Sequence, residues 1–231
     1  KKMKNTIITI DGHSGCGKST LAKSLAKELK FLYIDTGAMY RAISLFFLRS
    51  NLISNDGKLK NGYQHSMKDI KIDFSNPSSN GKSFVRLNTE VVEEEIRGID
   101  ISNLVSQVSK NRAVRMKMVS IQKSYGAENN LVMDGRDIGS VVFPNADLKF
   151  WLTASVEKRA YRRWLEYKQK GQNILIENVV ENINFRDKND ENRKESPLVK
   201  PLNSIEIDST HINAKETFLL TLDIIKNHLK Y

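Results

Sequence analysis

The chain alternates between short apolar runs and longer stretches in which apolar residues recur at helical spacing. The short runs predict buried strands at 7–10, 31–34, 131–133, 148–152 and 205–207. The spacing predicts helices over 18–29, 36–49, 104–125, 177–193 and 214–229, with a further basic helix after residue 155. Because strands alternate with helices, we expect right-handed βαβ units and an α/β fold, with a parallel five-stranded sheet flanked by helices.

Hydroxyl side chains mark two of the predicted helix starts. Thr36 is the expected N-cap of the helix that runs to Arg49. Thr153 or Ser155 is the expected N-cap of the basic helix. A hydroxyl oxygen at this position accepts a hydrogen bond from an unpaired N–H group of the first helical turn.

Residues 54–100 have a different pattern from the rest of the chain. Asparagine, serine, glycine and lysine are frequent there, and alternating pieces at 70–74 and 83–87 predict small strands. Since apolar residues recur throughout, we expect an inserted subdomain rather than a disordered linker. The predicted domains are a core formed by 1–53 and 101–231, and an insertion at 54–100.

Composition narrows the class of protein only slightly. Of 231 residues, 39% are hydrophobic and 28% charged, which is ordinary for a folded domain. The single cysteine rules out an internal disulfide framework, no apolar run reaches the length of a membrane span, and residues 1–5 lack a signal-peptide core. We therefore expect a cytoplasmic protein. The net charge of +10 indicates anionic partners, but the lysines are spread along the chain, so we expect nucleotides and no nucleic acid.

A glycine-rich loop follows the first predicted strand and opens the first predicted helix. Residues 12–19 fit G-x-x-x-x-G-K-[ST] without a mismatch, in the context that this phosphate-binding motif requires. Glycines allow backbone N–H groups to approach a triphosphate closely, and a helix N-terminus adds favourable partial charge. Lys18 would contact the β and γ phosphates of ATP, and the Ser19 hydroxyl would ligate Mg²⁺. The expected ATP-binding residues are Gly12, His13, Ser14, Gly15, Cys16, Gly17, Lys18, Ser19 and Thr20.

Arginines and aspartates distinguish among the many classes of protein that share this loop. Arg136 and Asp137 follow a predicted strand. Arg186, Asp190 and Arg193 are spaced i, i+4 and i+7, which predicts one face of one helix. An acceptor that is itself a phosphate needs several guanidinium groups. A surface ion-pair ladder would have the same spacing, but a phosphate loop in the same chain favours a binding site.

Together these motifs resemble those of bacterial cytidylate kinases. The matches are G-H-S-G-C-G-K-S-T at 12–20, D-T-G-A-M-Y-R at 35–41, S-Q-V at 106–108, V-R at 114–115, D-G-R-D-I-G-S-V-V-F-P at 134–144, K-R-A-Y-R-R at 158–163 and R-D-x-x-D-x-N-R at 186–193. They follow the family's order over nearly the whole chain. The resemblance implies a nucleoside monophosphate kinase fold with a P-loop core, in which 54–100 is an acceptor-binding domain and about 156–175 a short lid.

The resemblance also implies roles for individual residues. Around the cytosine would lie Thr36, Ser106, Arg115 and Asp137. The acceptor phosphate would contact Arg41, Arg136 and Arg193, and the sugar would contact Arg186 and Asp190. The lid would supply Arg159, Arg162 and Arg163, which with Lys18 would stabilise charge on the transferred phosphoryl group. No general base is expected, because the acceptor phosphate is already an oxyanion at pH 7.

We therefore expect a monomeric enzyme that transfers the γ-phosphoryl group of ATP to CMP or dCMP with Mg²⁺, in pyrimidine nucleotide metabolism. Two departures from the family pattern are Arg112, where proline is usual, and Glu191, where a basic residue is usual. We expect them to affect only a helix start and the surface. The alternatives are a kinase of adenylate, thymidylate or shikimate, an ATPase acting on nucleic acid, and a regulatory nucleotide-binding module.

Overall fold

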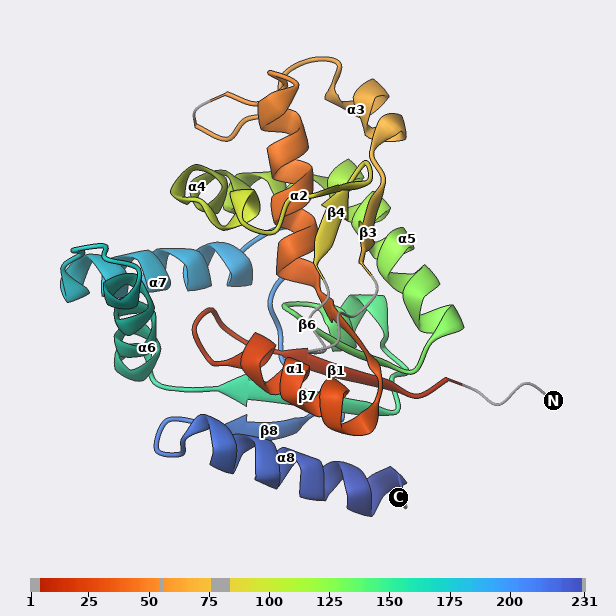
Figure 1. Ribbon diagram of the computed structural model, residues 1–231, viewed down its shortest axis with the longest axis vertical. Coiled ribbons are helices and arrows are strands. Elements are labelled where there is room, and N and C mark those ends of the chain that lie inside the picture. The colour runs from red at the N-terminus through yellow and green to blue at the C-terminus, as the bar shows by residue number, and fades with distance from the viewer. Residues whose placement is uncertain (1–4, 55, 76–83, 230–231) are drawn as a thin grey trace. The chain divides into compact units, whose positions relative to one another are not determined.

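The computed structural model describes residues 5–54, 56–75 and 84–229, and the chain divides into two compact units (Figure 1). The core unit comprises the described residues up to Tyr33 and from Asn129 onward, and the second unit runs from Ile34 to Glu128. Three segments on which predictions were made lie outside the described residues. They are residues 1–4, part of the predicted insertion, and the first residue of the predicted strand 83–87.

The core unit is built on the five-stranded parallel sheet that the apolar runs predict. Its strands are β1 Ile7–Asp11, β2 Leu32–Asp35, β6 Leu131–Gly135, β7 Leu148–Thr153 and β8 Ile205–Asp208. Their order is β2-β6-β1-β7-β8, and parallel ladders join β1 to β6, β1 to β7 and β7 to β8. The carboxyl ends of the strands therefore share one edge, which is where ligands bind in folds of this kind.

Four helices belong to the core unit: α1 Lys18–Leu29, α6 Val156–Gln169, α7 Ile176–Glu191 and α8 Ala214–Leu229. Leu25 of α1 and Ile225 of α8 share one apolar cluster with Phe150 of the sheet, so both helices cover the sheet. In Figure 1, α6 and α7 lie side by side as a helical hairpin, with Ala160 packed near Ile183. None of the helices that the structure describes is long and apolar enough to cross a membrane.

The ends of the two hairpin helices settle two predictions. The N-cap of α6 is Ser155, whose hydroxyl oxygen accepts a hydrogen bond from the N–H of Lys158 at 3.2 Å, so Ser155 rather than Thr153 is the cap. The helix predicted over 177–193 ends at Glu191. The prediction that Arg193 lies on this helix is therefore wrong, because the chain leaves the helix two residues earlier.

The second unit combines four helices with a small antiparallel sheet. Its helices are α2 Thr36–Arg49, α3 Tyr63–Ser66, α4 Ile99–Val108 and α5 Arg112–Glu128, with 3-10 turns at Met67–Asp69 and Glu95–Arg97. The sheet has strands β3 Ile72–Phe74, β4 Val85–Leu87 and β5 Glu90–Val91 in that order. Alternating residues at 70–74 and 83–87 did predict strands, but a separate acceptor-binding domain at 54–100 stays a prediction.

Local hydrogen bonds overturn two expectations in this unit. The N-cap of α2 is Asp35, not Thr36, because the Asp35 carboxylate accepts from the N–H of Ala38 at 2.9 Å. The helix predicted over 104–125 is two helices, α4 and α5, with a break at 109–111. Asn111 starts the second helix, since its side-chain oxygen accepts from the N–H of Val114 at 3.2 Å.

Candidate active site

The loop between β1 and α1 depends on glycine for its path. Gly12 has a φ of 149°, and a Cβ atom there would lie 2.0 Å from the carbonyl oxygen of Leu152. Gly17 has a φ of 93° and is the N-cap of α1, so no side chain accepts from the first turn at this position. The free N–H groups and the positive end of the helix dipole form an anion site, as the motif predicts.

Lys18 is held inside this loop. Its Nζ atom donates a hydrogen bond to the carbonyl oxygen of His13 at 2.6 Å, and only 6% of the residue is exposed. Burial, and then the positive charge of Arg136, lower the pKa of Lys18 to about 8. A polyphosphate would supply the negative charge that this buried ammonium group lacks.

The Ser19 hydroxyl has a carboxylate partner that the sequence analysis missed. Ser19 Oγ donates to Asp134 Oδ2 at 2.9 Å, and the hydroxyl of Tyr33 donates to Asp134 Oδ1 at 2.8 Å. A hydroxyl beside a carboxylate is a donor set that suits Mg²⁺, which prefers oxygen ligands. The signal was present in the sequence: Asp134 opens the D-G-R-D motif at the end of β6, the strand that pairs with β1.

Two of the three arginines predicted for the lid contact the backbone of the phosphate loop. Arg159 Nη1 donates to the carbonyl oxygen of Ser14 at 3.1 Å. Arg162 Nη1 donates to the carbonyl oxygen of Cys16 at 3.3 Å. Arg159 is almost fully buried, which ties α6 firmly to the loop.

The third of these arginines has a different environment. Arg163 Nη1 donates to Glu166 at 2.7 Å, and its guanidinium lies 4.8 Å from the ring centroid of Tyr167. Both partners belong to the same helix, α6. Movement of Arg163 would therefore break contacts within the helix only, and leave the phosphate loop unchanged.

The remaining loop residues differ in what they contribute. His13 contacts Glu191 through its ring, while the Ser14 and Cys16 carbonyl groups accept from arginines as described above. The Cys16 side chain is buried in the same apolar cluster as Leu25 and Phe150. Thr20 is exposed on the first turn of α1.

Asp11, at the end of β1, fixes the loop that carries Arg136 and Asp137. Its two carboxylate oxygens accept from the N–H groups of Ile138 at 2.8 Å and Gly139 at 2.7 Å. Burial raises the pKa of Asp11 to about 7, although these two hydrogen bonds act in the opposite direction. The sequence analysis did not identify Asp11 as a site residue, because its partners are more than a hundred positions away along the chain.

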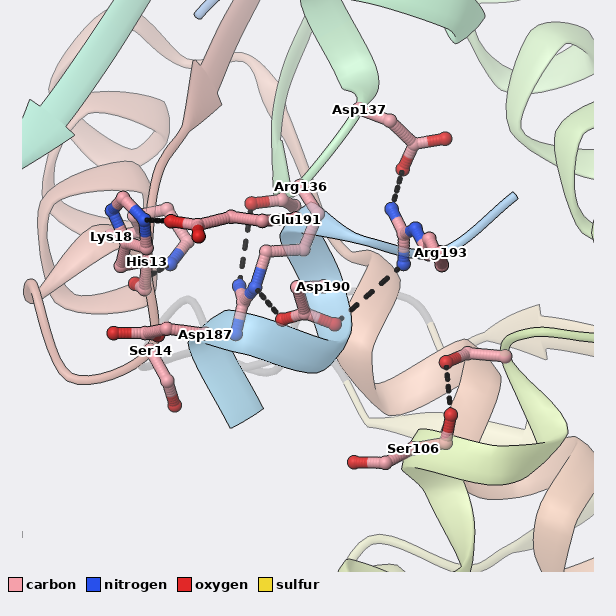
Figure 2. Close-up of polar contacts among 12 residues, drawn as sticks. His13, Ser14, Lys18, Ser106, Arg136, Asp137, Asp187, Asp190, Glu191 and Arg193 are labelled. Atoms are coloured by element: carbon pink, nitrogen blue, oxygen red, sulfur yellow. Dashed lines mark hydrogen bonds and ion pairs between the residues drawn. The ribbon is translucent and has the colours of Figure 1, made fainter. Parts of the chain in front are cut away.

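Four of the five predicted acceptor residues of the core unit form one ion-pair cluster (Figure 2). Arg136 Nε donates to Asp190 Oδ2 at 2.9 Å, and Arg193 Nη1 lies 3.8 Å from Asp190 Oδ1. Arg193 Nη2 lies 3.6 Å from Asp137 Oδ1, and both of these residues are buried. Asp137 therefore pairs with Arg193, whereas Arg136 pairs with Asp190.

Arg186 is close enough to this cluster to be repelled by Arg136 and attracted by Asp190. Burial, and then the positive charge of Arg136, lower the pKa of Arg186 to about 10, while Asp190 acts to raise it. Arg163 adds a further positive charge nearby. An anion placed among these guanidinium groups would relieve the repulsion.

Four predicted acceptor residues belong to the second unit, where each is held by local contacts. Thr36 is buried in the first turn of α2, and Arg41 Nη1 donates to Ser102 Oγ at 2.7 Å. Arg115 is buried, donates to the carbonyl oxygen of Ser109 at 3.1 Å, and lies over the Tyr40 ring. The Ser106 carbonyl oxygen accepts from Ser109 Oγ at 3.1 Å.

A glycine loop between a buried strand and an uncapped helix, a buried lysine, and a hydroxyl–carboxylate pair together define a P-loop phosphotransferase. A solved structure of an uncharacterized protein from Eubacterium ventriosum has a TM-score of 0.52 at 11% identity, covers 97% of this chain and 99% of its own, and shows the fold alone. The cytidylate kinase family matches residues 8–227. The chain belongs to the cytidylate kinase family.

Individual relatives agree with the family match. A cytidylate kinase of Flavobacterium johnsoniae is 46% identical over 228 residues, which is 99% of this chain and 99% of that protein. A cytidylate kinase of Clostridioides difficile is 45% identical over 208 residues, or 90% and 92% of the two chains. The resemblance that the sequence motifs indicated is therefore confirmed.

Proposed function

We propose that this protein transfers the γ-phosphoryl group of ATP to CMP, and to dCMP, giving ADP and the corresponding diphosphate. Membership of the cytidylate kinase family supports the reaction. The observation that carries the proposal is the arginine–aspartate cluster of Arg136, Asp137, Asp190 and Arg193, half-buried to buried, in the same compact unit as a complete phosphate loop. A phosphate loop alone serves many reactions, whereas this cluster provides for a second, phosphorylated substrate.

The donor nucleotide binds at the loop before α1. Backbone N–H groups of residues 12–20 surround its phosphates, and Lys18 leaves the His13 carbonyl oxygen to contact the β and γ phosphates. Ser19, with Asp134 behind it, would hold Mg²⁺, and the metal would supply positive charge that neutralises these phosphates. Arg159 and Arg162 keep the loop in shape through its carbonyl groups.

The acceptor phosphate binds among arginines. In the core unit we assign this role to Arg136 and Arg193, and we extend it to Arg186, because the depressed pKa of Arg186 reflects positive charge that an anion would neutralise. Asp190 then orients the arginines and contacts the sugar. The contribution of Arg41, in the second unit, stays a prediction from the family resemblance.

The base is read by a buried carboxylate. Asp137 accepts from the exocyclic amine of cytosine, and the same carboxylate repels the carbonyl oxygen that uracil has at this position. From the resemblance we assign Arg115 to the ring nitrogen or carbonyl group of cytosine, and Thr36 and Ser106 to its edges. The burial of Arg115 and Thr36, and the hydrogen bond from Arg115 to the Ser109 carbonyl oxygen, support rigid donors of this kind.

The transfer itself needs placement and charge neutralisation rather than proton abstraction. An oxygen of the CMP phosphate attacks the γ-phosphorus in line, the bond to the β-γ bridging oxygen breaks, and ADP leaves. We assign stabilisation of the moving charge to Lys18 and to a lid arginine, Arg163. Closure of the segment 156–175 would also exclude water, which would otherwise hydrolyse ATP.

We further propose that the enzyme is a cytoplasmic monomer whose partners are nucleotides and not nucleic acid. The scattered lysines, and the burial of Lys18, Arg159 and Arg193 within the core unit, support this use of the positive charge.

Product analysis tests the proposed reaction. The protein is incubated with ATP, Mg²⁺ and CMP, and the nucleotides are separated by anion-exchange chromatography. CDP and ADP in equal amounts are expected. ADP formed without CDP would identify an ATPase instead and overturn the proposal.

A further inference from the structure

The C-terminal end of α7 carries three acidic residues, and each contacts a different basic side chain of the core unit. They are Asp187, Asp190 and Glu191 (Figure 2). The family resemblance assigned a role only to Asp190, and a basic residue is usual where this chain has Glu191. The contacts of the other two acids are therefore informative.

Asp187 and Glu191 both hold the phosphate loop. Glu191 Oε1 accepts from Nε2 of His13 at 2.7 Å, across 178 positions of sequence. Asp187 Oδ2 accepts from Arg159 Nη1 at 2.6 Å, and the same nitrogen donates to the Ser14 carbonyl oxygen at 3.1 Å. Two consecutive residues of the loop are thus fixed from one helical turn, so Glu191 is more than the surface residue that the sequence predicted.

Asp190, between them, holds the acceptor arginines. It accepts from Arg136 at 2.9 Å and lies 3.8 Å from Arg193, which in turn lies 3.6 Å from Asp137. Because Asp190 and Glu191 are adjacent in one helix, their backbone positions cannot move independently. A ligand that draws an arginine away from Asp190 therefore acts on the helix end that also holds the loop.

The donor end of this connection is equally direct. The carbonyl oxygen of His13 accepts from Lys18 Nζ, while the imidazole of the same residue contacts Glu191. In the proposed binding mode, Lys18 moves from that oxygen towards the phosphates of ATP, which changes a contact of the His13 peptide. The Glu191 contact passes this change to α7.

We propose that His13 and Glu191 are positioning residues that couple the donor and acceptor sites, so that each substrate raises the affinity for the other. The inference rests on the proposed function, because it needs ATP at the loop and a nucleoside monophosphate at the arginines. Ordering of the α7 end by one substrate lowers the entropic cost of binding the second. By linkage the coupling factor is the same in both directions.

The test measures this coupling factor by calorimetry. The dissociation constant of the β,γ-imido analogue of ATP, with Mg²⁺, is measured without and with saturating CMP. For the wild type, we expect saturating CMP to lower the dissociation constant of the ATP analogue. We expect Glu191→Gln to lower the coupling factor by about two- to fivefold, which is the size of effect expected from one partly exposed polar contact. The affinity for each nucleotide alone should change less.

Two further variants separate coupling from general damage. His13→Gln should lower the coupling factor as Glu191→Gln does. The coupling factor of the double variant should be no lower than that of either single variant, because both changes act on the same contact. The matched control is Glu181→Gln, an exposed change on the same helix about 15 Å away along its axis, which should keep the wild-type factor.

The outcomes distinguish the inference from the proposed function. A wild type that binds both nucleotides and phosphorylates CMP, with no coupling or with coupling that survives Glu191→Gln, overturns the inference alone. Additive losses in the double variant also overturn it. A wild type that does not bind CMP overturns the proposed function and the inference together.

Discussion

At the residue scale, burial and neighbouring positive charge lower the pKa values of two cations in the candidate site. Lys18 has its pKa lowered to about 8 and Arg186 to about 10, in both cases first by burial and then by Arg136. Asp134 and Asp190 offset only part of this charge. Substrates that carry phosphate groups would neutralise the remaining positive charge. Replacement of Lys18 or Arg186 should therefore affect activity much more than stability.

Replacement of Lys18 tests this directly. Lys18→Ala should lower the rate of CDP formation by about 10²-fold or more, because the lysine stabilises charge at the transferred phosphoryl group. Its melting temperature should stay close to that of the wild type, since the folded protein gains little from a buried ammonium group. Lys27→Ala, an exposed change on the same helix, is the control and should keep full activity. Near-wild-type activity of Lys18→Ala would remove the loop from the mechanism.

Asp137 should determine the choice of base. A buried carboxylate that faces a uracil carbonyl group leaves unpaired polar atoms, so we expect the wild type to prefer CMP over UMP by about 10²-fold in kcat/KM. Asp137→Ala should lose most CMP activity and narrow that ratio. If the variant keeps the wild-type preference at a lower overall rate, Asp137 only supports Arg193, with which it pairs, and the base is read elsewhere.

At the element scale, Asp35 shows how one side chain starts a helix and joins two segments. It caps α2 through Ala38 and accepts from Arg97 Nη2 at 3.0 Å. Asp35→Asn should keep the cap and lose the charge, whereas Asp35→Ala loses both. Denaturant unfolding should therefore show Asp35→Ala less stable than Asp35→Asn by about 1 kcal/mol. Equal stability of the two variants would contradict the cap.

The ion pair between Asp35 and Arg97 should make the stability of the fold depend on pH. Burial acts to raise the pKa of Asp35, but the charge and hydrogen bond of Arg97, together with the hydrogen bond from the Ala38 N–H group and the charge of Arg41, hold the pKa below its ordinary 3.8. A depressed pKa stabilises the folded state fully above the unfolded value and loses that effect as pH falls through the folded value. The stability advantage of the wild type over Asp35→Asn should thus be constant above about pH 5 and shrink below pH 4. An advantage that grows on acidification would contradict the assignment.

Two arginines of α6, Arg162 and Arg163, should have different roles, which the kinetics of their variants can distinguish. The hydrogen bond and the ring contact described for Arg163 are both within α6, so we expect Arg163 to reach the phosphoryl group on closure, and Arg163→Ala should lower kcat with little change in the KM for CMP. Arg162 contacts the loop backbone, so Arg162→Ala should chiefly raise the KM for ATP. Steady-state kinetics distinguish the two, and a pure KM effect of Arg163→Ala would place that residue outside the transition state.

Most helices and strands could be predicted, because the regular spacing of their apolar residues ends at a clear boundary in the sequence. Helices α1 and α8 match their predicted ranges residue for residue. The break at 109–111 was missed because apolar residues continue at helical spacing on both sides, while the side chain of Asn111 starts a new helix. Contacts such as His13 with Glu191 could not be predicted, since no local pattern relates two residues 178 positions apart.

At the scale of the whole molecule, the charge balance agrees with the family assignment. The chain carries a net charge of +10, yet some of its cations are buried within the core unit instead of forming a basic surface. Mg²⁺-bound ATP and CMP each bring about two negative charges at pH 7. The positive net charge is therefore consistent with a nucleotide kinase, which must bind two small polyanions.

The most direct measurement of the central claim is an acceptor panel. Initial rates of ADP release are measured with ATP, Mg²⁺ and, in turn, CMP, dCMP, UMP, AMP, dTMP, GMP and shikimate. The account predicts the highest kcat/KM with CMP or dCMP, and at least about 10²-fold lower values for the other acceptors. Faster phosphorylation of AMP, dTMP or shikimate, or ADP release that does not depend on any acceptor, would contradict it.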